Sequence, residues 1–343
     1  MRIALLEAVS AGLCGDSPGI SLLHEGLAMW RALIEDLASV PGVQIDSLLG
    51  VPWQEHRLDV ERLHIWPTNG PAEAVMCWAS ALEDADHALV IAPESEGCLL
   101  QLATALPSTI HSWNCSLAAI GLCSDKLRLA EHLQRCGVAT IPTEIEAWIR
   151  PPAPDDYPCV IKPRDGAGSF LVRRVTADVD WREVRDEYAA HGNPPAIRQP
   201  CIVGGALSIA GWCRGDRVQW FPVAEQHLST DGRFEYRGGR IPADMPDPVV
   251  DAVRALAQKT VASIPGLRGY IGCDILRPEK SPLTPLLVEV NPRFTTSYVG
   301  YRHWWARSPW QDWLSEADAT LLPRGEIGRV HFRADGTVFC DDR

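Results

Sequence analysis

No run of the sequence approaches the roughly 18 consecutive apolar residues that a membrane-spanning helix requires. An excess of positive charge is also missing, because 32 Lys and Arg face 44 Asp and Glu, a net charge of −12. Such an acidic chain lacks the electrostatic footprint of a protein that binds nucleic acid or an anionic membrane. Hydrophobic residues at 46% and charged residues at 22% exclude disorder, collagen and coiled coil. We expect a globular protein with no nucleic-acid and no membrane partner.

Paired cysteines are missing as well. The 11 cysteines are odd in number, and no two are spaced as C-x-x-C. Single cysteines stand inside apolar stretches, which favours small buried side chains in a reducing compartment over disulfides; they include Cys98, Cys159, Cys201 and Cys273. The apolar start of the chain is interrupted by Glu7, which favours a first β-strand over a signal peptide. We therefore expect a cytoplasmic protein.

Several common catalytic motifs are missing. No G-x-G-x-x-G follows a strand, no G-K-[ST] occurs, and His24-Glu25 fails as H-E-x-x-H because position 28 is Ala. The segment Gly15-Asp-Ser-Pro-Gly19 does match the G-x-S-x-G pattern of serine hydrolases. However, Pro18 follows the serine and has no backbone N–H to donate to an oxyanion. The pattern therefore does not favour a serine hydrolase.

The first third of the chain alternates strand and helix. Apolar runs at 3–9, 43–49 and 88–92 suit buried strands, and a helical periodicity of apolar residues covers 23–37. This alternation predicts a small doubly wound α/β domain over residues 1–113. Ligands of open α/β sheets bind at the carboxyl ends of the strands, and the loop that begins at Pro93 follows such an end.

The rest of the chain predicts α+β structure, in a subdomain over 114–195 and a second over 196–343. Asp125 is expected to cap a helix that Gly137 ends. The other expected elements are strands at 159–162, 170–175, 270–276 and 286–290, three β runs between 196 and 229, a helix at 249–264, and a hairpin after residue 330.

A lysine and a glycine-rich turn follow one another in the first of these subdomains. Lys162 ends an apolar strand, and Gly166, Gly168 and Ser169 come directly after it. A lysine beside a loop whose N–H groups can close over oxyanions is suited to holding polyphosphate. On its own, the pattern fits an ordinary hairpin with an exposed lysine better.

Three oxygen-bearing side chains lie on two neighbouring strands of the second subdomain. Asp274 is on one strand, and Glu289 and Asn291 are on the other. Two carboxylates and an amide oxygen suit Mg²⁺ that bridges phosphates, although a solvated strand pair would show the same residues. The two groups of residues together, in this order along the chain, favour a nucleotide site.

At these positions the sequence resembles the ATP-grasp superfamily. The segment from Glu289 to Arg302 is similar to a signature of the tyramine–L-glutamate ligases of methanofuran biosynthesis, as are residues 92–96, 236–239 and 269–274. The resemblance covers nearly the whole chain. The residues that carry it for the superfamily are Lys126, Val160-Ile-Lys162 with its glycine loop, Gln199-Pro-Cys-Ile202-Val-Gly204, Asp274 and Glu289-Val-Asn291.

The resemblance implies an ATP-grasp fold, in which a Rossmann-like pre-ATP-grasp domain (1–113) precedes two α+β subdomains (114–195 and 196–343) that clamp ATP. Lys126 and Lys162 would contact the phosphates beneath a lid formed by Gly166, Gly168 and Ser169. Gln199 and Ile202 would present backbone groups to the adenine. Asp274, Glu289 and Asn291 would carry Mg²⁺, with Mn²⁺ as an alternative, and Arg293 would hold the phosphoryl group or the substrate carboxylate.

The implied activity is that of an ATP-dependent, ADP-forming C–N ligase. A carboxylate would become an acyl phosphate and then an amide with a small primary amine, and glutamate is the first candidate for the acid. The ligases that the sequence resembles act in cofactor biosynthesis. Both substrates are small molecules, and a homodimer is left open. Glu94 or Glu96 is expected to bind a substrate ammonium group. Thr295, Thr296 and Ser297 form a donor-rich surface for a carboxylate, unless their hydroxyls only cap the following helix.

Two departures from the superfamily pattern qualify this interpretation. Ala206 stands where many members carry an acid that binds the ribose. Ala224-Glu225-Gln226 replaces an Asn-basic-Gln triplet, so that Glu225 reverses a charge and could attract a cationic amine. Two alternatives therefore stay open, a catalytically altered ATP-binding protein and an ATP-grasp kinase.

Overall fold

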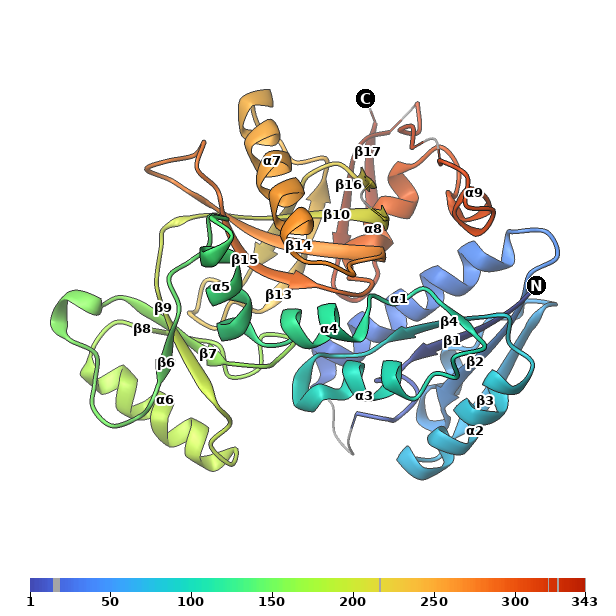
Figure 1. Ribbon diagram of the computed structural model, residues 1–343, viewed down its shortest axis with the longest axis horizontal. Helices are drawn as coiled ribbons and strands as arrows, with labels where there is room; N and C mark the ends of the chain where they lie inside the picture. Colours follow the sequence, from blue (N-terminus) through green and yellow to red (C-terminus); the bar gives the residue numbers. More distant parts are fainter. Residues whose placement is uncertain (15–18, 216, 320, 326, 343) are drawn as a thin grey trace.

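The computed structural model describes residues 1–14, 19–215, 217–319, 321–325 and 327–342. It contains a five-stranded sheet, a four-stranded sheet and an eight-stranded sheet, at the lower right, lower left and top of Figure 1. The central residues of the hydrolase-like motif, 15–18, lie outside the described part. In that part, no helix is long and apolar enough to cross a membrane. All 11 cysteines are free thiols, and Cys98 and Cys201 are half-buried rather than buried.

The N-terminal sheet is parallel, with the strand order β3-β2-β1-β4-β5. Side chains alternate along β1, so Ile3 and Leu5 pack with helix α1 on one face, whereas Ala4 and Leu6 pack with α2, α3 and α4 on the other. This is the expected doubly wound arrangement. Its elements are β1 (Arg2–Glu7), α1 (Ile20–Ala38), β2 (Gln44–Gly50), η1 (Val51–His56), β3 (Leu63–Thr68), α2 (Pro71–Glu83), β4 (His87–Ile91), η2 (Ser95–Gly97), α3 (Cys98–Thr104) and β5 (His111–Ser112).

Helix α1 lies unusually close to the end of β1. A Cβ atom added to Gly26 would lie 2.6 Å from Oε2 of Glu7, whose carboxylate accepts hydrogen bonds from the backbone N–H groups of Val9 and Ser10. Only a glycine leaves room for this buried carboxylate beneath the helix. Gly26 therefore sets the distance between α1 and the sheet.

The four-stranded sheet is antiparallel, with the order β6-β9-β7-β8, and α6 covers it with a hydrophobic core of its own. The structure places β9 in this sheet, so the sheet extends beyond the expected boundary at residue 195. The elements are β6 (Glu144–Glu146), η3 (Pro154–Asp156), β7 (Cys159–Pro163), β8 (Arg173–Val175), α6 (Asp178–Ala190) and β9 (Ala196–Pro200).

The eight-stranded sheet has the order β15-β14-β10-β12-β13-β16-β17, with β11 beside β10. Helices α4, α5 and α7 share a hydrophobic cluster with it, so α4 and α5 pack on this sheet rather than on the four-stranded one. The elements are α4 (Leu117–Cys123), α5 (Lys126–Arg135), β10 (Gly204–Arg214), β11 (Arg217–Trp220), β12 (Ala224–Leu228), β13 (Tyr236–Ile241), α7 (Asp247–Ser263), β14 (Gly269–Pro278), β15 (Leu286–Asn291), α8 (Ser297–Trp304), α9 (Trp310–Leu314), β16 (Ile327–Arg333) and β17 (Val338–Asp342).

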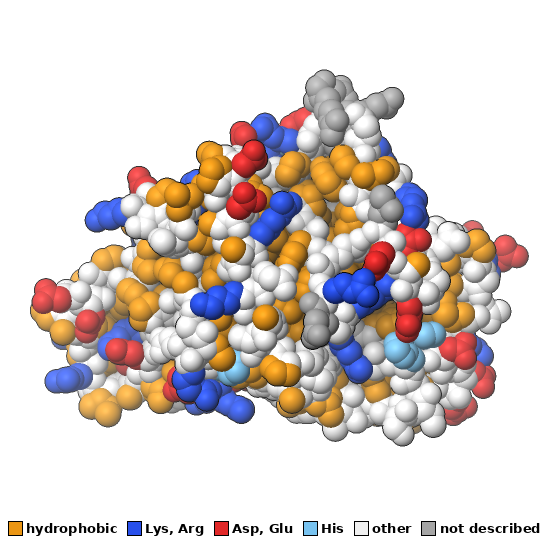
Figure 2. All heavy atoms as spheres, turned by 45° about the horizontal axis from the view of Figure 1, so that its top comes forward, with side chains coloured by type: hydrophobic (Ala, Val, Ile, Leu, Met, Phe, Trp, Pro, Cys, Tyr) orange, Lys and Arg blue, Asp and Glu red, His pale blue; other side chains and the backbone are white. Residues whose placement is uncertain are grey.

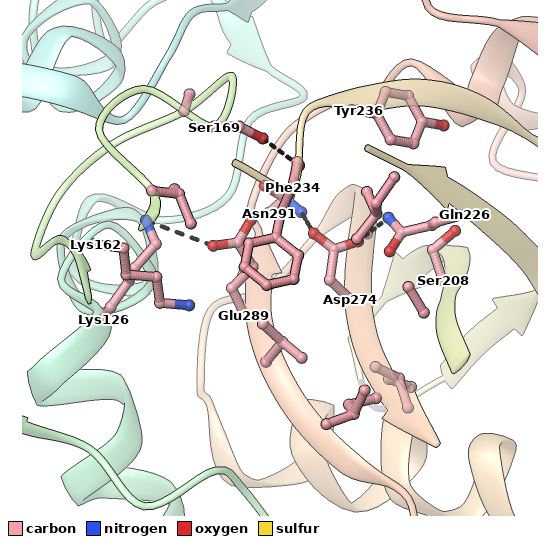
Figure 3. Close-up of a pocket in the computed structure, with 18 of the residues that line it drawn as sticks. Lys126, Lys162, Ser169, Ser208, Gln226, Phe234, Tyr236, Asp274, Glu289 and Asn291 are labelled. Carbon is pink, nitrogen blue, oxygen red and sulfur yellow. Dashed lines mark hydrogen bonds and ion pairs between the residues drawn. The ribbon is translucent and has the colours of Figure 1, made fainter. Parts of the chain in front are cut away.

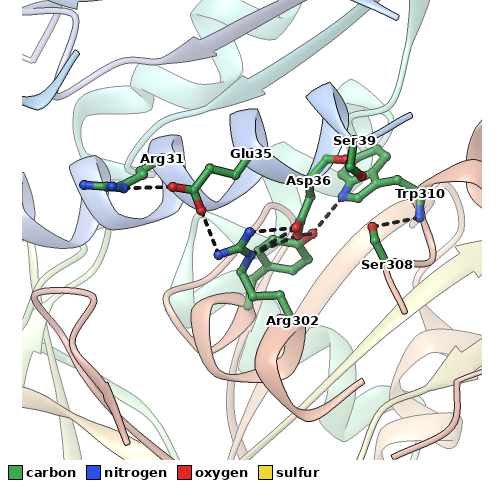
Figure 4. A network of polar contacts seen from close by, with 8 residues as sticks. Arg31, Glu35, Asp36, Ser39, Arg302, Ser308 and Trp310 are labelled. Carbon is green, nitrogen blue, oxygen red and sulfur yellow. Dashed lines mark hydrogen bonds and ion pairs between the residues drawn. The ribbon is translucent and has the colours of Figure 1, made fainter. Parts of the chain in front are cut away.

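The N-terminal sheet and the eight-stranded sheet are joined by shared cores, because two hydrophobic clusters draw residues from both. A polar network adds to this contact (Figure 4). Asp36 on α1 accepts hydrogen bonds from the Tyr298 hydroxyl and from Arg302 Nη2 on α8, the latter at 2.8 Å. Trp310 Nε1 donates to the Tyr298 hydroxyl at 2.7 Å. Helices α1 and α8 are thereby held side by side.

Charged side chains of both signs are interspersed with apolar ones on the face shown in Figure 2. This distribution agrees with a chain whose acidic and basic residues are spread along its length.

Candidate active site

A cavity of about 360 Å³ lies where helix α1, the four-stranded sheet and the eight-stranded sheet meet. It brings together most of the residues that the sequence singled out, although they are far apart in the chain. Glu94, Glu96 and Glu225 are not among its lining residues. The expected residues that do line it are Lys126, Lys162, Gly166, Gly168, Ser169, Gln199, Ile202, Asp274, Glu289, Asn291, Arg293, Thr295, Thr296 and Ser297.

Two lysines point into the cavity (Figure 3). Lys162, on β7, is only 6% exposed, and burial lowers its pKa to about 8. Lys126 begins α5, which Asp125 caps as expected by accepting from the backbone N–H of Arg128. The Nζ atom of Lys126 donates to the carbonyl of Gly166 at 2.8 Å and lies 3.5 Å from Oε2 of Glu289. Two ammonium groups in one partly desolvated cavity are suited to a polyanion such as a triphosphate.

The glycine loop after β7 closes the cavity by contacting both other parts of the molecule. The backbone N–H of Ala167 donates to Ser95 Oγ at 3.2 Å, in the N-terminal domain. The hydroxyl of Ser169 donates to the carbonyl of Phe234 at 2.8 Å, in the loop between β12 and β13 of the eight-stranded sheet. Gly168 has a φ of +65°, and a Cβ added there would lie 3.4 Å from Cδ1 of Leu22 on α1. The loop therefore lies over the cavity as a lid.

The expected metal ligands face one another across two paired strands. Asp274 on β14 is directly opposite Glu289 on β15, and Asn291 is two residues further along β15. Asp274 accepts from Gln226 Nε2 at 2.8 Å and from Asn291 Nδ2 at 3.1 Å. Burial, followed by the neighbouring Glu289, raises the pKa of Asp274, because two carboxylates at one buried place disfavour a second negative charge.

Glu289 ionises more readily than its partner. Burial opposes its charge, but the ammonium groups of Lys126 and Lys162 outweigh this effect and lower the pKa of Glu289. Within the described residues, no group of three or more His, Cys, Asp or Glu side chains could hold a metal ion. Two adjacent carboxylates with an amide oxygen beside them fit Mg²⁺, which usually takes few protein ligands and completes its shell with water and phosphate oxygens.

Another part of the cavity has an apolar lining and lies at the connection between the four-stranded and the eight-stranded sheets. Val160, Ile202 and Leu276 are among its lining residues. Ile202 belongs to the segment between β9 and β10 that links the four-stranded sheet to the eight-stranded one. Gln199 is buried, and its Nε2 donates to Thr143 Oγ1 at 2.8 Å. This part is suited to a planar, weakly polar group such as a nucleobase.

Ala206 lines the cavity on β10, opposite Leu276 of β14. A methyl group at this position offers no hydrogen-bond acceptor. Ala206 therefore cannot make the ribose contact that an acidic residue makes there in many superfamily members.

The other departure, Glu225, has a different outcome. Side chains alternate along β12, so Gln226 reaches Asp274, whereas Glu225 pairs with Arg240 Nη2 at 2.6 Å and accepts from the backbone N–H of Asp244. The charge of Glu225 is therefore balanced outside the cavity.

Arg293 lies two residues after the end of β15 and makes its main contact with the N-terminal domain. Its Nε and Nη2 donate to the two carboxylate oxygens of Glu94, and its Nη1 donates to the carbonyl of Phe294 at 3.1 Å. Glu94 is 5% exposed and already holds a cation, which differs from its expected role toward a substrate ammonium group. Glu96 is exposed, and its backbone N–H donates to Asp165 Oδ2 on the lid.

The hydroxyl groups after Arg293 do not act as helix caps. Thr296 is the N-cap residue of α8, but its side chain makes no capping hydrogen bond. Its Oγ1 instead donates to Glu25 Oε2 at 2.8 Å. Thr295, Ser297 and Tyr270 form a hydroxyl cluster with O–O distances of 2.8 to 3.4 Å. The alternative that these residues only cap a helix is therefore wrong for Thr296.

The sequence interpretation gave no role to several residues that line the cavity, among them Glu25 and also Tyr236, although the latter lies in the motif at 236–239. Glu25 comes from α1, and Tyr236 begins β13. Burial raises the pKa of Glu25, although the Thr296 hydroxyl and the charge of Arg293 oppose the shift. No local pattern marks Glu25, because it is one of three acidic residues on α1 and its partner Thr296 is 271 positions away.

Two family models match the chain. One is described as the ATP-grasp domain and matches residues 123–297, and the other is described as the pre ATP-grasp 3 domain and matches residues 51–120. The chain is 25% identical to the tyramine–L-glutamate ligase of Methanocaldococcus fervens over 82% of this chain and 84% of that protein. Identity is also 25% to the tyramine–L-glutamate ligase of Methanocaldococcus jannaschii, over 88% of this chain and 86% of that protein.

Solved structures show the same fold. A crystal structure from Archaeoglobus fulgidus, described as an ATP-grasp superfamily protein, has a TM-score of 0.73 at 24% identity and covers 97% of this chain and 92% of that one. The L-amino acid ligase of Bacillus licheniformis has a TM-score of 0.67 at 14% identity, over 96% of this chain and 78% of that one. The expected order of a pre-ATP-grasp domain and an ATP-grasp fold is confirmed.

Proposed function

Because the chain belongs to the ATP-grasp family of ATP-dependent C–N ligases, we propose that it joins the carboxylate of an amino acid, glutamate first, to a small primary amine. The observation that carries this proposal is the grouping of Lys126, Lys162, Asp274 and Glu289 in one cavity. Two cations for phosphates next to two carboxylates for a metal ion are the requirements of a site that activates a carboxylate with ATP.

In this proposal, Lys126 and Lys162 hold the phosphates of ATP, and the lid loop from Gly166 to Ser169 excludes water above them. The adenine lies in the apolar part near Ile202. When bound, Mg²⁺ would neutralise phosphate charge beside Asp274, Glu289 and Asn291. Catalysis by these residues consists of positioning and charge neutralisation, since the protein forms no covalent bond with the substrates.

The proposed reaction has two steps. A carboxylate oxygen of the amino acid attacks the γ-phosphorus of ATP, which releases ADP and leaves an acyl phosphate. The neutral amine then attacks the acyl carbon, which releases inorganic phosphate and leaves an amide after the nitrogen loses a proton. Arg293 lines the cavity and uses three of its five N–H groups in the contacts to Glu94 and Phe294. Its remaining donors are suited to the carboxylate or to the developing acyl phosphate.

Two observations support glutamate and a primary amine as substrates. The relatives from the two Methanocaldococcus species are tyramine–L-glutamate ligases, and the match extends over most of each chain. The hydroxyl cluster of Thr295, Ser297 and Tyr270 beside the metal-ligand strand offers hydrogen-bond donors for a second carboxylate. Methanofuran-type cofactor biosynthesis is the proposed context.

The test is ADP release from ATP and Mg²⁺ over a matrix of amino acids and amines, with the products identified by mass. A ligase gives ADP and a γ-glutamyl amide only when an acid and an amine are both present. Stoichiometric ADP with a phosphorylated product and no amide would identify a kinase instead. If another acid forms amides and glutamate forms none, the glutamate assignment is wrong and the ligase assignment stands.

A further inference from the structure

Three of the charged side chains that line the cavity, Lys126, Glu289 and Arg293, have an oppositely charged partner. Lys126 lies 3.5 Å from Glu289, and the guanidinium of Arg293 is held by both oxygens of Glu94. Glu25 belongs to no ion pair of the described residues, and neither do Lys162 and Asp274. The oxygens of Glu25 accept only from hydroxyl groups, from Thr296 at 2.8 Å and from Ser21 at 3.4 Å. A negative charge therefore faces the cavity without a cation of its own.

Such an arrangement is costly for the empty protein. A carboxylate removed from water loses hydration that hydroxyl groups replace only in part. Burial accordingly raises the pKa of Glu25, and the Thr296 hydroxyl and the more distant Arg293 only oppose the shift. A ligand that brings a positive charge and N–H donors would satisfy this group. A ligand carboxylate or phosphate would be repelled by it.

Glu25 lies in the part of the cavity between the lid and the segment that carries Arg293. Leu22 and Glu25 are three residues apart and therefore neighbours on one face of α1. The lid lies on this face, since a Cβ atom added to Gly168 would lie 3.4 Å from Leu22 Cδ1. On its other side, Glu25 is joined through Thr296 to the segment that carries Arg293, just after the metal-ligand strand. Glu25 thus lies below the closed lid, beside the proposed site of acyl transfer.

The charge and the hydrogen-bonding groups in this part of the cavity point to an ammonium ligand rather than to a metal ion. Glu25 is not part of any group of three His, Cys, Asp or Glu side chains that could hold a metal, as far as the chain is described. Tyr236 lies close enough for the charge of Glu25 to contribute to raising its pKa, after burial. A carboxylate with a phenol and a threonine hydroxyl beside it offers several oxygen acceptors, which matches the three N–H donors of a primary ammonium group.

We propose that Glu25, oriented by Thr296, binds the primary ammonium group of a substrate. The ammonium comes either from the amino acid whose carboxylate is activated or from the acceptor amine before it loses its proton. This assignment rests on the proposed ligase function and names the residue that selects amino-bearing substrates. It replaces the role that the sequence interpretation gave to Glu94 and Glu96, of which one is held by Arg293 and the other is exposed.

The experiment compares ligands that differ only in the ammonium group. Calorimetry would measure the binding of L-glutamate and glutarate, and of tyramine and 4-ethylphenol, to the enzyme loaded with Mg²⁺ and a non-hydrolysable ATP analogue. The variants are Glu25→Gln and, as a matched control, Glu83→Gln, which makes the same change on the exposed end of α2. The dissociation constant of the ATP analogue, measured for each variant, reports whether the cavity is intact.

The wild type should bind one amino-bearing compound about ten- to a hundredfold more tightly than its deamino partner, the range for a charge-assisted contact. Glu25→Gln should remove that preference without weakening the deamino compound or the ATP analogue, and Glu83→Gln should keep it. The pair of compounds whose preference is lost in Glu25→Gln, either L-glutamate and glutarate or tyramine and 4-ethylphenol, identifies the source of the ammonium group. The proposal is overturned if Glu25→Gln keeps the preference or if the wild type shows none. Absence of an amide when both substrates and ATP are mixed would instead count against the ligase function, which separates the two failures.

Discussion

The guanidinium of Arg293 holds both carboxylate oxygens of Glu94 at 2.8 Å, although the two residues are 199 positions apart. The contact joins the end of β15 to the loop after β4, and the two side chains are 12% and 6% exposed. Because Arg293 also lines the cavity, Glu94 fixes the orientation of its guanidinium there.

The first prediction follows from this pair. Glu94→Gln leaves a buried guanidinium without its counter-charge, and breaking one partner of a buried ion pair costs about 3–5 kcal/mol. We expect a lower free energy of urea unfolding and a higher KM for the acid substrate. Glu96→Gln, an exposed control, should change neither quantity. Equal effects of the two substitutions would show that the pair has no special role.

Lys162 should dominate nucleotide affinity. Lys162→Ala removes a charge-assisted hydrogen bond worth roughly 1.5–3 kcal/mol, so the dissociation constant of an ATP analogue should rise about ten- to a hundredfold. Lys280→Ala, which removes an exposed lysine in the turn after β14, should leave this constant unchanged. Calorimetry measures the dissociation constant of the ATP analogue for both variants. An unaltered dissociation constant in Lys162→Ala would exclude a phosphate contact by this residue.

Nucleotide binding should depend on pH through the same lysine. Its pKa of about 8 in the free protein lies below the ordinary value because burial disfavours the charged form. A bound phosphate favours the charged form and raises the pKa, so ADP binding at about pH 8.5 takes up protons and weakens as the pH rises further.

This uptake can be measured by titrating ADP in two buffers that differ in ionisation enthalpy. EDTA keeps the carboxylates of Asp274 and Glu289 free of metal during the titration. Lys162→Met should abolish the uptake. Binding without proton uptake in the wild type would show that Lys162 keeps its charge in the free protein.

Glu289→Gln should abolish ligation while the fold is kept. The amide retains the shape of the side chain but removes one of the two carboxylates that suit Mg²⁺. Mn²⁺ binding to the ADP complex, followed by electron paramagnetic resonance, should weaken in parallel with turnover. Glu279→Gln, on an exposed turn after β14, provides the control. Full turnover by Glu289→Gln would remove this residue from the metal site.

Two glycines in helices should respond oppositely to alanine. Alanine normally stabilises a helix by up to about 1 kcal/mol relative to glycine. At Gly121 in α4 the new Cβ would lie 3.8 Å from Leu100, an ordinary contact, so Gly121→Ala should raise Tm. At Gly26 the Cβ would lie 2.6 Å from Glu7, so Gly26→Ala should lower Tm. A rise in both would mean that α1 can move away from β1 at little cost.

The sequence predicted the parts of the site that depend on local pattern. Asp274 and Glu289 could be placed on paired strands because apolar runs and their acidic ends mark neighbouring strands. Asp125 was recognisable as a cap because the helix signal follows it directly. In contrast, strand β3 was missed because it carries His64 and Pro67, which interrupt an apolar run.

Contacts between distant segments could not be predicted from pattern alone. A helical periodicity tells which face of α1 is buried, but it does not tell that Glu25 meets Thr296 or that Asp36 meets Arg302. Glu94 was correctly placed at a strand end, yet its partner Arg293 belongs to another domain. The position of Glu225 was accessible in principle, since strict alternation along a strand puts it on the face opposite to Gln226.

The shared cores of the N-terminal and eight-stranded sheets have a consequence for how the molecule opens. Separating these two parts would expose tryptophans that are now buried, among them Trp30, Trp305 and Trp310. The four-stranded sheet has a core of its own and carries the lid, so we expect it to be the part that moves when the cavity opens. If the proposed reaction is correct, ATP entry and the release of ADP and amide would each require this movement of the four-stranded sheet.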